Sequence, residues 1–576
     1  MTHASFLDSL WGDVILPEPG AGERKPTSLL VLLRNNLLVS ALIFAGLEFW
    51  RPCFFLTDDN LAGALPFLTE MGRQMLSGHS PFVSQHLFGG GYNFLRDPGN
   101  FGWHPLYFLV SLLAGTSLHL LMIDVIACVY CLLATAGFVS LAHYLRREMP
   151  LTISDGWIMF YTLSFTYSMI ALTTGASWVN FLGNQSALPW LVLGILQKNW
   201  RWGIGLVALF SLHQVMGGHL APTLSSSIFL SVFAAGVSIS RRSFLPLGNW
   251  FAGYALALLI ILPLLIPLLG GFFSSARFHG VTLANMQANN VPVMEFPTAL
   301  FMGMDLWMIN PHDHPGATYT QALGSCAAAW CLVPAMLGRG RWRGLELVSL
   351  GVMIFTAVLI CRPVWITEIM MHLPLFRSMR WPFREFLQYQ FFLHLFLLVR
   401  PPGLTRPLRL FAAGWGTAIM VIPMLLYVVP PTLNPLAWDR ELILGGGFDR
   451  YWDQVRPLLK PTDRIAVLLP RNLYEDESLD KPYSLLGTFD YAVLAGVVST
   501  GGYSQTPPRD QLYTKTYAYY PFGAYLPEEK VSLLAERPDL KFITLESVQP
   551  LRITLSSRDG PTIDLTPFVP KRIGSP

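Results

Sequence analysis

Charged residues are scarce in the first three quarters of this chain, and no other feature constrains its fold as strongly. Only 41 of residues 1–430 are Asp, Glu, Lys or Arg, whereas 34 of the 146 residues from 431 to 576 are charged. Because about one residue in four is charged in a soluble protein, we expect lipid around the first part. The sequence therefore predicts a polytopic α-helical membrane protein and excludes a soluble enzyme, a disordered chain and a coiled coil.

The apolar runs predict about 11 transmembrane helices, because about 20 helical residues cross the hydrocarbon core and the shorter runs can borrow flanking residues. They divide the chain into a cytoplasmic N-terminal segment (1–35), a transmembrane domain (36–430) and a small soluble C-terminal domain (431–576). The predicted spans are 36–56, 117–144, 157–173, 180–197, 203–217, 221–239, 246–269, 321–337, 344–361, 386–400 and 409–430.

Basic residues predict the orientation, since cytoplasmic loops are enriched in Lys and Arg. With the N-terminus in the cytoplasm, alternation of the spans places 15 basic residues inside and 8 outside. The C-terminal domain is then extracytoplasmic. The inner set is Arg24, Lys25, Arg34, Arg146, Arg147, Lys198, Arg201, Arg241, Arg242, Arg339, Arg341, Arg343, Arg400, Arg406 and Arg409.

The outer loops 52–104, 270–320 and 362–385 are long, whereas the inner loops contain a few residues each. Long loops on a compact scaffold commonly carry function, so we expect the activity on the outer side. The net charge of +3 and the lack of a basic stripe in the sequence argue against a nucleic-acid partner.

Two adjacent carboxylates, Asp58 and Asp59, follow the first predicted span directly. Carboxylates at the membrane boundary are costly to desolvate, so they need a partner, a cation or a chemical task. The alternative is a solvated pair that caps the next helix. The stretch 61–77 that follows has apolar residues on one helical face, which predicts an amphipathic interfacial helix.

The third outer loop ends with three arginines, Arg377, Arg380 and Arg384, among aromatic residues. This composition suits a phosphate at headgroup depth, and the alternative is anchoring at the interface by Arg and Trp. The crowding of positive charge on the side that normally lacks it favours an anionic ligand.

The second outer loop contains His312-Asp313-His314, a pattern that could bind a metal. The flanking prolines and the lack of further ligand spacing favour a turn, so no metal site is predicted.

Cys128 and Cys131 have redox-motif spacing but lie within an apolar run, which favours two core residues. Polar residues inside the spans are expected to bond between helices; they are Asp124, His213, Gln214 and His394.

The C-terminal domain has two strand-like runs, 464–469 and 540–545, with a helix-like stretch, 449–459, before the first. This alternation predicts a small α/β unit. The segment Gly501–Gln505 is interpreted as a binding or docking loop.

Several short motifs along the chain, together with the acidic pair, resemble those of the bacterial YfhO-type membrane proteins, within the wider C-type (GT-C) fold of integral membrane glycosyltransferases. The motifs are Arg73-x-x-Leu76-x-Gly78-x-x-Pro81, Gly89–Asn93, Trp103-His104-Pro105-Leu106, Ala187-Leu188-Pro189-Trp190, Leu373-Pro374-Leu-Phe-Arg377-x-x-Arg380-x-Pro382-x-Arg384 and Gly502-Tyr503.

The resemblance implies sugar transfer from a polyprenyl-phosphate donor to an envelope glycan, lipid or protein acceptor, outside the cytoplasmic (inner) membrane of a bacterium. It also implies that Asp58 or Asp59 is the catalytic base. Arg377, Arg380 and Arg384 are then candidates for binding the donor phosphate, and Arg73 and His104, within the shared motifs, for further substrate contacts. No cofactor is predicted, although the acidic pair could help to hold a divalent cation.

Two other classes of function fit the same outline. A lipid-linked glycan transporter or flippase should carry charged residues deep in several spans and an internal repeat, and only Asp124 fits the first requirement. A non-catalytic scaffold of an envelope polysaccharide system would use the C-terminal domain for docking and would tolerate loss of both aspartates.

Overall fold

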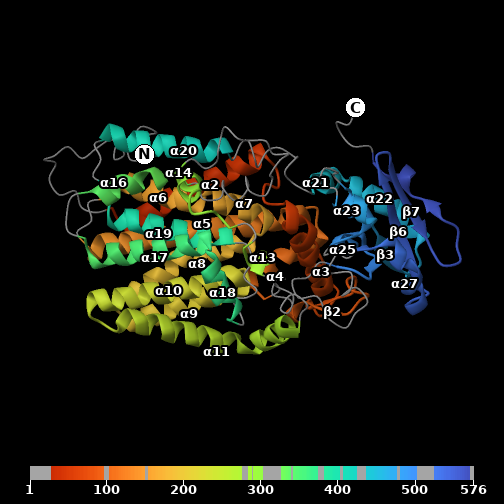
Figure 1. The fold of residues 1–576 in the computed structure, drawn as a ribbon, viewed down its shortest axis with the longest axis horizontal. Helices are drawn as coiled ribbons and strands as arrows, with labels where there is room; N and C mark the ends of the chain where they lie inside the picture. The colour runs from red at the N-terminus through yellow and green to blue at the C-terminus, as the bar shows by residue number, and fades with distance from the viewer. Residues whose placement is uncertain are drawn as a thin grey trace.

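The structure is a computed structural model in which long helices lie side by side along the longest axis, with a small sheet-containing domain at one end (Figure 1). We call these parts the helical body and the C-terminal domain. The structure describes residues 27–96, 103–149, 153–274, 283–287, 290–301, 326–338, 342–373, 382–402, 406–423, 436–475, 481–502 and 524–570.

Five helical segments of the body are long and apolar enough to cross a membrane, which confirms the predicted class of protein. They correspond to α2 (Leu29–Trp50), α5 (Met122–Glu148) with the turn before it, α10 (Leu220–Arg241), α11 (Leu245–Ser274) and α17 (Gly344–Cys361). This number, among the described residues, is smaller than the predicted eleven.

The other predicted spans coincide with helices that are shorter or less apolar. The span 157–173 is divided at Tyr167, whose hydroxyl donates to the backbone oxygen of Ser40 at 2.7 Å. The helices in question are α6 (Asp155–Thr166), α7 (Met169–Ser177), α8 (Asn180–Leu196), α9 (Trp200–Gly217), α16 (Leu332–Leu337), α19 (Phe386–Val399) and α20 (Arg406–Pro423).

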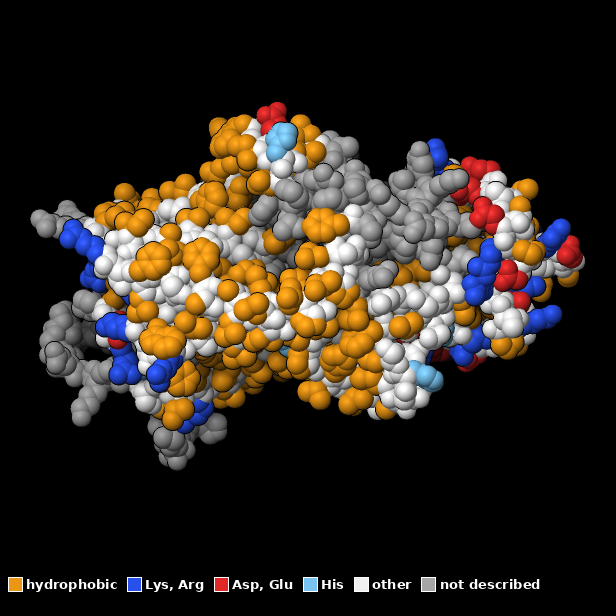
Figure 2. Space-filling model, turned by 90° about the horizontal axis from the view of Figure 1, so that it is seen from below, with side chains coloured by type: hydrophobic (Ala, Val, Ile, Leu, Met, Phe, Trp, Pro, Cys, Tyr) orange, Lys and Arg blue, Asp and Glu red, His pale blue; other side chains and the backbone are white. Residues whose placement is uncertain are grey.

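The centre of the helical body is formed by α8 and α19. Every residue of α19 is buried, as is nearly every residue of α8. By contrast, α2 and α11 expose large apolar side chains such as Phe49, Leu259 and Ile266. Figure 2 shows such side chains covering much of the side of the body. An apolar exterior around a packed interior is the arrangement expected when lipid surrounds the helices.

The basic loops that were assigned to the cytoplasmic side meet at one end of the helical body. Figure 2 shows Lys and Arg gathered at the end opposite the C-terminal domain. The loops are joined by contacts between neighbouring helix ends, namely Arg146–Asp155, Lys198–Glu148, Arg241–Leu196 and Arg400–Glu346. The charge alternation in the sequence thus corresponds to two distinct ends of the folded body.

The C-terminal domain is an α/β unit, as predicted. Its sheet has the order β4-β3-β6-β7-β8, and β5 also pairs with β3. The strand β3 is parallel to β4, β5 and β6, while β6, β7 and β8 are antiparallel. The elements are α21 (Ala437–Leu444), α22 (Gly447–Val455), β3 (Arg464–Leu468), α24 (Tyr483–Leu486), α25 (Tyr491–Ala495), β4 (Val498–Ser499), β5 (Ala524–Tyr525), α27 (Lys530–Glu536), β6 (Leu540–Val548), β7 (Leu551–Ser556) and β8 (Ile563–Asp564).

The first outer loop folds into a layer between the helical body and the C-terminal domain. Its helix α3 (Leu65–Leu76) is buried on almost every side, so the expectation of an interfacial helix is wrong. On the polar face, Glu70 and Gln74 are buried against protein, while Arg73 stays exposed. Glu70 accepts hydrogen bonds from Ser84 Oγ and Gln85 N, both at 2.6 Å, at the hairpin of β1 (Val83–Ser84) and β2 (Tyr92–Asn93).

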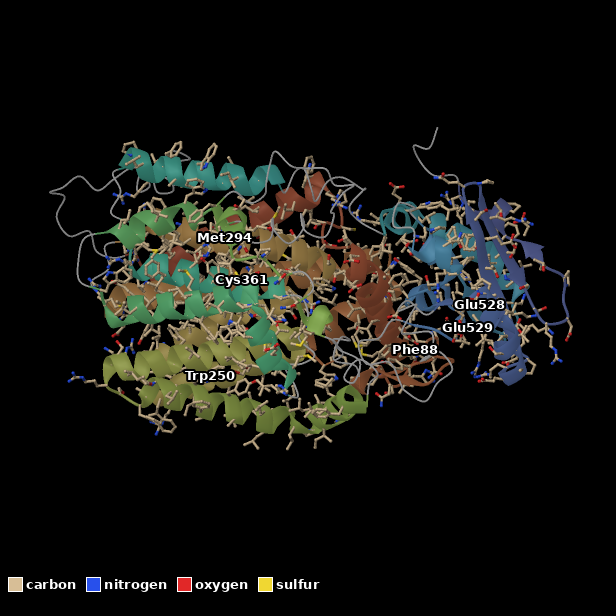
Figure 3. The ribbon with its side chains drawn as sticks, viewed as in Figure 1. Phe88, Trp250, Met294, Cys361, Glu528 and Glu529 are labelled. Carbon is tan, nitrogen blue, oxygen red and sulfur yellow. The ribbon has the colours of Figure 1, made fainter. Side chains whose placement is uncertain are left out.

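The end of this hairpin is bonded to the C-terminal domain through the backbone, at the junction where Figure 3 labels Phe88. Phe88 N donates to Gly501 O at 3.1 Å, and Gly89 N donates to Ser499 O at 2.7 Å. A Cβ atom at Gly502 would lie 3.0 Å from the Phe88 ring, so this close approach favours glycine. Gly501 and Gly502 therefore pack against the first outer loop, while the rest of the predicted binding or docking loop lies outside the described residues.

A single hydrophobic core runs from the first outer loop into the C-terminal domain. On its edge, the Arg440 guanidinium donates to three backbone oxygens in the turn after α2, those of Leu56 at 3.0 Å, Pro52 at 2.6 Å and Cys53 at 3.1 Å. The C-terminal domain is therefore fixed on the loop that carries the acidic pair.

We expect Arg440→Ala to lower the free energy of unfolding by about 2 kcal/mol, because three backbone oxygens lose a charged donor. Thermal unfolding in detergent and the rate of limited proteolysis between the body and the domain measure this. Arg450→Ala is the matched control, since exposed Arg450 makes one long bond of 3.4 Å to Gly445 O. Equal stability of the two variants would contradict the proposed role of Arg440.

Candidate functional site

The acidic pair lies on an unusual stretch of backbone at the end of the helical body that faces the C-terminal domain. Asp58 has a φ of 47°, in the left-handed region that few non-glycine residues adopt. The residues after Asp59 form a π-helical turn, η1 (Asn60–Ala64). Both features recur at functional sites, where the surrounding structure holds the chain in a costly conformation.

Asn60 supplies much of that support. Its side-chain amide donates to Phe55 O and Gly175 O, both at 2.8 Å, and its carbonyl accepts from Val179 N at 2.9 Å. Thr57 Oγ1 adds a bond to Ala176 O at 2.8 Å. The acidic pair is therefore held beside residues 175–179, the end of α7 and its link to α8.

The surroundings of Asp58 disfavour its charged form. Burial, together with the neighbouring charge of Asp59, raises the pKa of Asp58 to about 8. A hydrogen bond with the Ser177 side chain acts against this shift. The residue as a whole keeps partial exposure, so a carboxyl group that titrates near neutral pH lies at the edge of the site.

Asp59 is linked to Arg384 through Trp178. The Trp178 indole donates to Asp59 Oδ2 at 2.6 Å. The Arg384 guanidinium lies over the Trp178 ring at 4.8 Å and over the Phe181 ring at 5.4 Å. The structure thus brings together one acidic and one basic candidate from loops more than 300 residues apart, while Arg377 and Arg380 fall outside the described residues.

Arg384 belongs to a buried charged group just before α19. Glu385 follows it, 3% exposed, and burial raises the pKa of Glu385 to about 7, against the influence of Arg362 and Arg384. Arg362 is 1% exposed and donates to Met286 O at 3.0 Å. Because two arginines lie beside one carboxyl group, this part of the site has a net positive charge, which favours an anionic ligand.

His104 occupies a chain of buried hydrogen bonds. Its Nδ1 accepts from Leu106 N at 3.2 Å, so Nε2 carries the proton of the neutral ring and donates to His213 Nδ1 at 2.9 Å. His213 Nε2 then donates to Ser186 Oγ at 2.8 Å. Burial lowers the pKa of His104 to about 4, which keeps the ring neutral. Both ring nitrogens are used within the protein, and the substrate role of His104 stays a prediction.

Arg73 lies at the domain junction, where its Nη1 donates to Val493 O at 2.9 Å. Its substrate role also stays a prediction.

Within the spans, His394 bonds to Ser164 Oγ at 3.0 Å, which confirms the expected contact between helices. Cys128 and Cys131 are both free thiols. No group of three or more metal-ligating side chains occurs in the described part of the chain; His312-Asp313-His314 lies outside it.

Sequence reasoning overlooked Ser177, Trp178 and Phe181, although they connect the acidic pair to Arg384. The available signal was their position: Ser177 and Trp178 lie in the short outer connection between the predicted spans 157–173 and 180–197, and Phe181 lies at the start of the second span. Aromatic residues at helix ends are so common in membrane proteins that this position alone does not single them out.

Comparison of the chain with family models, curated proteins and solved structures finds no match. The similarity to YfhO-type proteins therefore stays a prediction from short motifs. What the chain does must be inferred from the chemistry of its own site.

The raised pKa of Asp58 predicts how stability depends on pH. The native protein keeps the Asp58 proton up to about pH 8, whereas the unfolded chain releases it near the ordinary value of 3.8. Native protein then binds more protons between these values, so stability falls as pH rises from about 4 to about 8. We expect the unfolding temperature of wild type to fall more steeply across this window than that of Asp58→Asn. Parallel curves would contradict a raised pKa.

Proposed function

We propose that this protein is a membrane glycosyltransferase that moves a sugar from a polyprenyl-phosphate donor to an acceptor on the outer side of the bacterial cytoplasmic membrane. The observation that carries the proposal is the link Asp59–Trp178–Arg384, beside a carboxyl group, Asp58, that titrates near neutral pH. A proton acceptor and an anion-binding cation at the end of apolar helices meet the two requirements of transfer from a lipid phosphate.

Asp58 is the proposed base. A general base works best when its pKa lies near the working pH, and Asp58 meets this condition. Ionised Asp58 takes the proton from the acceptor hydroxyl, whose oxygen forms the new bond to the anomeric carbon of the sugar. The bond between that carbon and the phosphate oxygen breaks, and its electron pair leaves with the lipid phosphate. Asp59, which accepts from Trp178, orients this neighbour.

Arg384 is the proposed partner of the departing phosphate. A guanidinium stacked on an aromatic face still presents its in-plane N–H groups, whose geometry matches two phosphate oxygens. Positive charge fixed where negative charge develops lowers the barrier to departure without a general acid. Arg377 and Arg380 remain candidates for the same phosphate from the preceding loop.

The proposed orientation places the N-terminus in the cytoplasm and the C-terminal domain outside, with about 11 spans. It is supported by the contacts that join the basic loops at the end of the body opposite the acidic pair. In this orientation the site lies at the outer boundary of the bilayer, where a lipid-linked donor presents its phosphate and sugar.

Replacement of the two aspartates distinguishes their roles. Asp58→Asn removes the proton acceptor, so we expect kcat to fall by about 10²-fold or more with donor binding retained. Asp59→Asn can still accept the Trp178 bond but removes a charge that raises the pKa of Asp58. The rising limb of its pH–rate profile should therefore shift to lower pH. The measurement is sugar transfer from a polyprenyl-phosphate donor as a function of pH.

Near-wild-type transfer by the double Asn variant would overturn the enzyme proposal at these residues. Loss of activity in Asp59→Asn with full activity in Asp58→Asn would reverse the two assignments.

Replacement of Arg384 by Lys keeps the charge but loses the two-pronged donor, so we expect donor affinity to drop about tenfold, or 1.4 kcal/mol. Arg400→Lys is the matched control, because Arg400 is also buried, lies 4.1 Å over the Trp342 ring, and flanks the opposite end of α19. Titration of detergent-purified protein with a polyprenyl phosphate measures both. Equal affinity in the two variants would leave Arg384 as a packing residue.

A further inference from the structure

The end of α7 and its link to α8, residues 175–179, contact the acidic segment through the backbone. The Asn60 amide donates to Gly175 O at 2.8 Å and to Ala176 O at 2.9 Å. The Asn60 carbonyl accepts from Val179 N at 2.9 Å. These bonds use only backbone atoms of the link, so they can form whatever side chain residue 178 carries.

Trp178 extends from this link and makes two chemically different contacts. At the edge of its indole, Nε1 donates to Asp59 Oδ2 at 2.6 Å. The face of its ring lies 4.8 Å from the Arg384 guanidinium, which also lies over the Phe181 ring at 5.4 Å. One side chain therefore contacts both the acidic pair and the candidate phosphate-binding cation, and each contact uses a different part of the ring.

The position of the indole is fixed by its backbone as well as by these contacts. Trp178 N donates to Thr174 O at 2.6 Å, and Trp178 O accepts from Phe181 N at 2.9 Å. The side chain has only two rotatable bonds, and the bond at its edge and the cation on its face restrict both. A residue held in this way can keep two functional groups at a set spacing.

Sugar transfer depends on such a spacing. The acceptor oxygen bonds to the anomeric carbon while the phosphate oxygen leaves it, so the base and the cation must lie at a distance that accommodates one sugar. A displacement of about 1 Å can lower the rate by about 10²-fold. Asp59 and Arg384 come from loops more than 300 residues apart, so only tertiary contacts can set this distance.

We infer that Trp178 is a positioning residue that sets the spacing between the acidic pair and Arg384, with its N–H group acting on the base and its ring on the phosphate-binding cation. This inference rests on the proposed function, since it concerns the same reaction. It adds that the two contributions are separable. Loss of the N–H group should affect turnover, and loss of an aromatic face should affect donor affinity.

Trp178→Phe and Phe181→Leu separate the two contributions. Trp178→Phe removes the donor to Asp59 but keeps an aromatic ring for Arg384, so kcat should fall about tenfold while Kd for a polyprenyl phosphate changes by less than about twofold. Phe181→Leu removes one ring from Arg384 and leaves the Asp59 bond, so Kd should rise about threefold with kcat retained. Trp178→Leu removes both contacts and should change both constants.

Trp250→Phe and Trp342→Leu are the matched controls. Trp250 is buried, its Nε1 donates to Ser231 Oγ at 2.8 Å, and Figure 3 labels it in the helical body, away from the C-terminal domain. The Trp342 ring lies 4.1 Å from the Arg400 guanidinium. The first control loses an indole N–H bond and the second loses a ring from an arginine, so both should keep the wild-type kcat and Kd.

The split between kcat, from sugar transfer, and Kd, from titration of detergent-purified protein, decides the inference. A purely packing role of Trp178 would lower the unfolding temperature without producing this split. If wild type transfers sugar but Trp178→Phe matches Trp250→Phe in kcat, or Phe181→Leu matches Trp342→Leu in Kd, the inference fails and the proposed function stands. If wild type transfers no sugar, the proposed function fails and the inference fails with it.

Discussion

The backbone of residues 51–62 crosses from the helical body to the C-terminal domain, and its polar groups must find partners away from water. Two side chains hold it from opposite sides: Asn60 bonds toward the body, and Arg440 bonds from the domain. Because these bonds fix the segment on both sides, it can hold Asp58 at a φ of 47° and a π-helical turn next to it. The rest of the site depends on this double attachment.

The same attachment explains the electrostatics of the site. Burial disfavours the charged form of Asp58, and the adjacent charge of Asp59 acts in the same direction. Trp178 donates to Asp59, and the Arg384 guanidinium lies over its ring.

Much of the fold could be predicted from the sequence because membrane helices and buried strands have strong patterns. The runs at 344–361 and 464–469 became α17 and β3 with nearly the same bounds. The prediction of an interfacial helix for 61–77 was wrong, because an amphipathic helix has the same sequence pattern whether its polar face contacts headgroups or protein. For α3 that face meets the hairpin and Val493, and no local signal distinguishes these surroundings.

The sequence by itself determined that most of this chain requires lipid, that its basic loops alternate and that Asp58, Asp59 and Arg384 lie near helix ends, because charge and hydropathy are properties of single residues. Only the tertiary structure decided which of them meet. Trp178 connects Asp59 to Arg384, and Arg440 bonds to Leu56 O in the turn before the acidic pair from 384 residues away. Such proximity arises from the packing of whole helices and of one domain on a loop, and packing is a property of all the residues together.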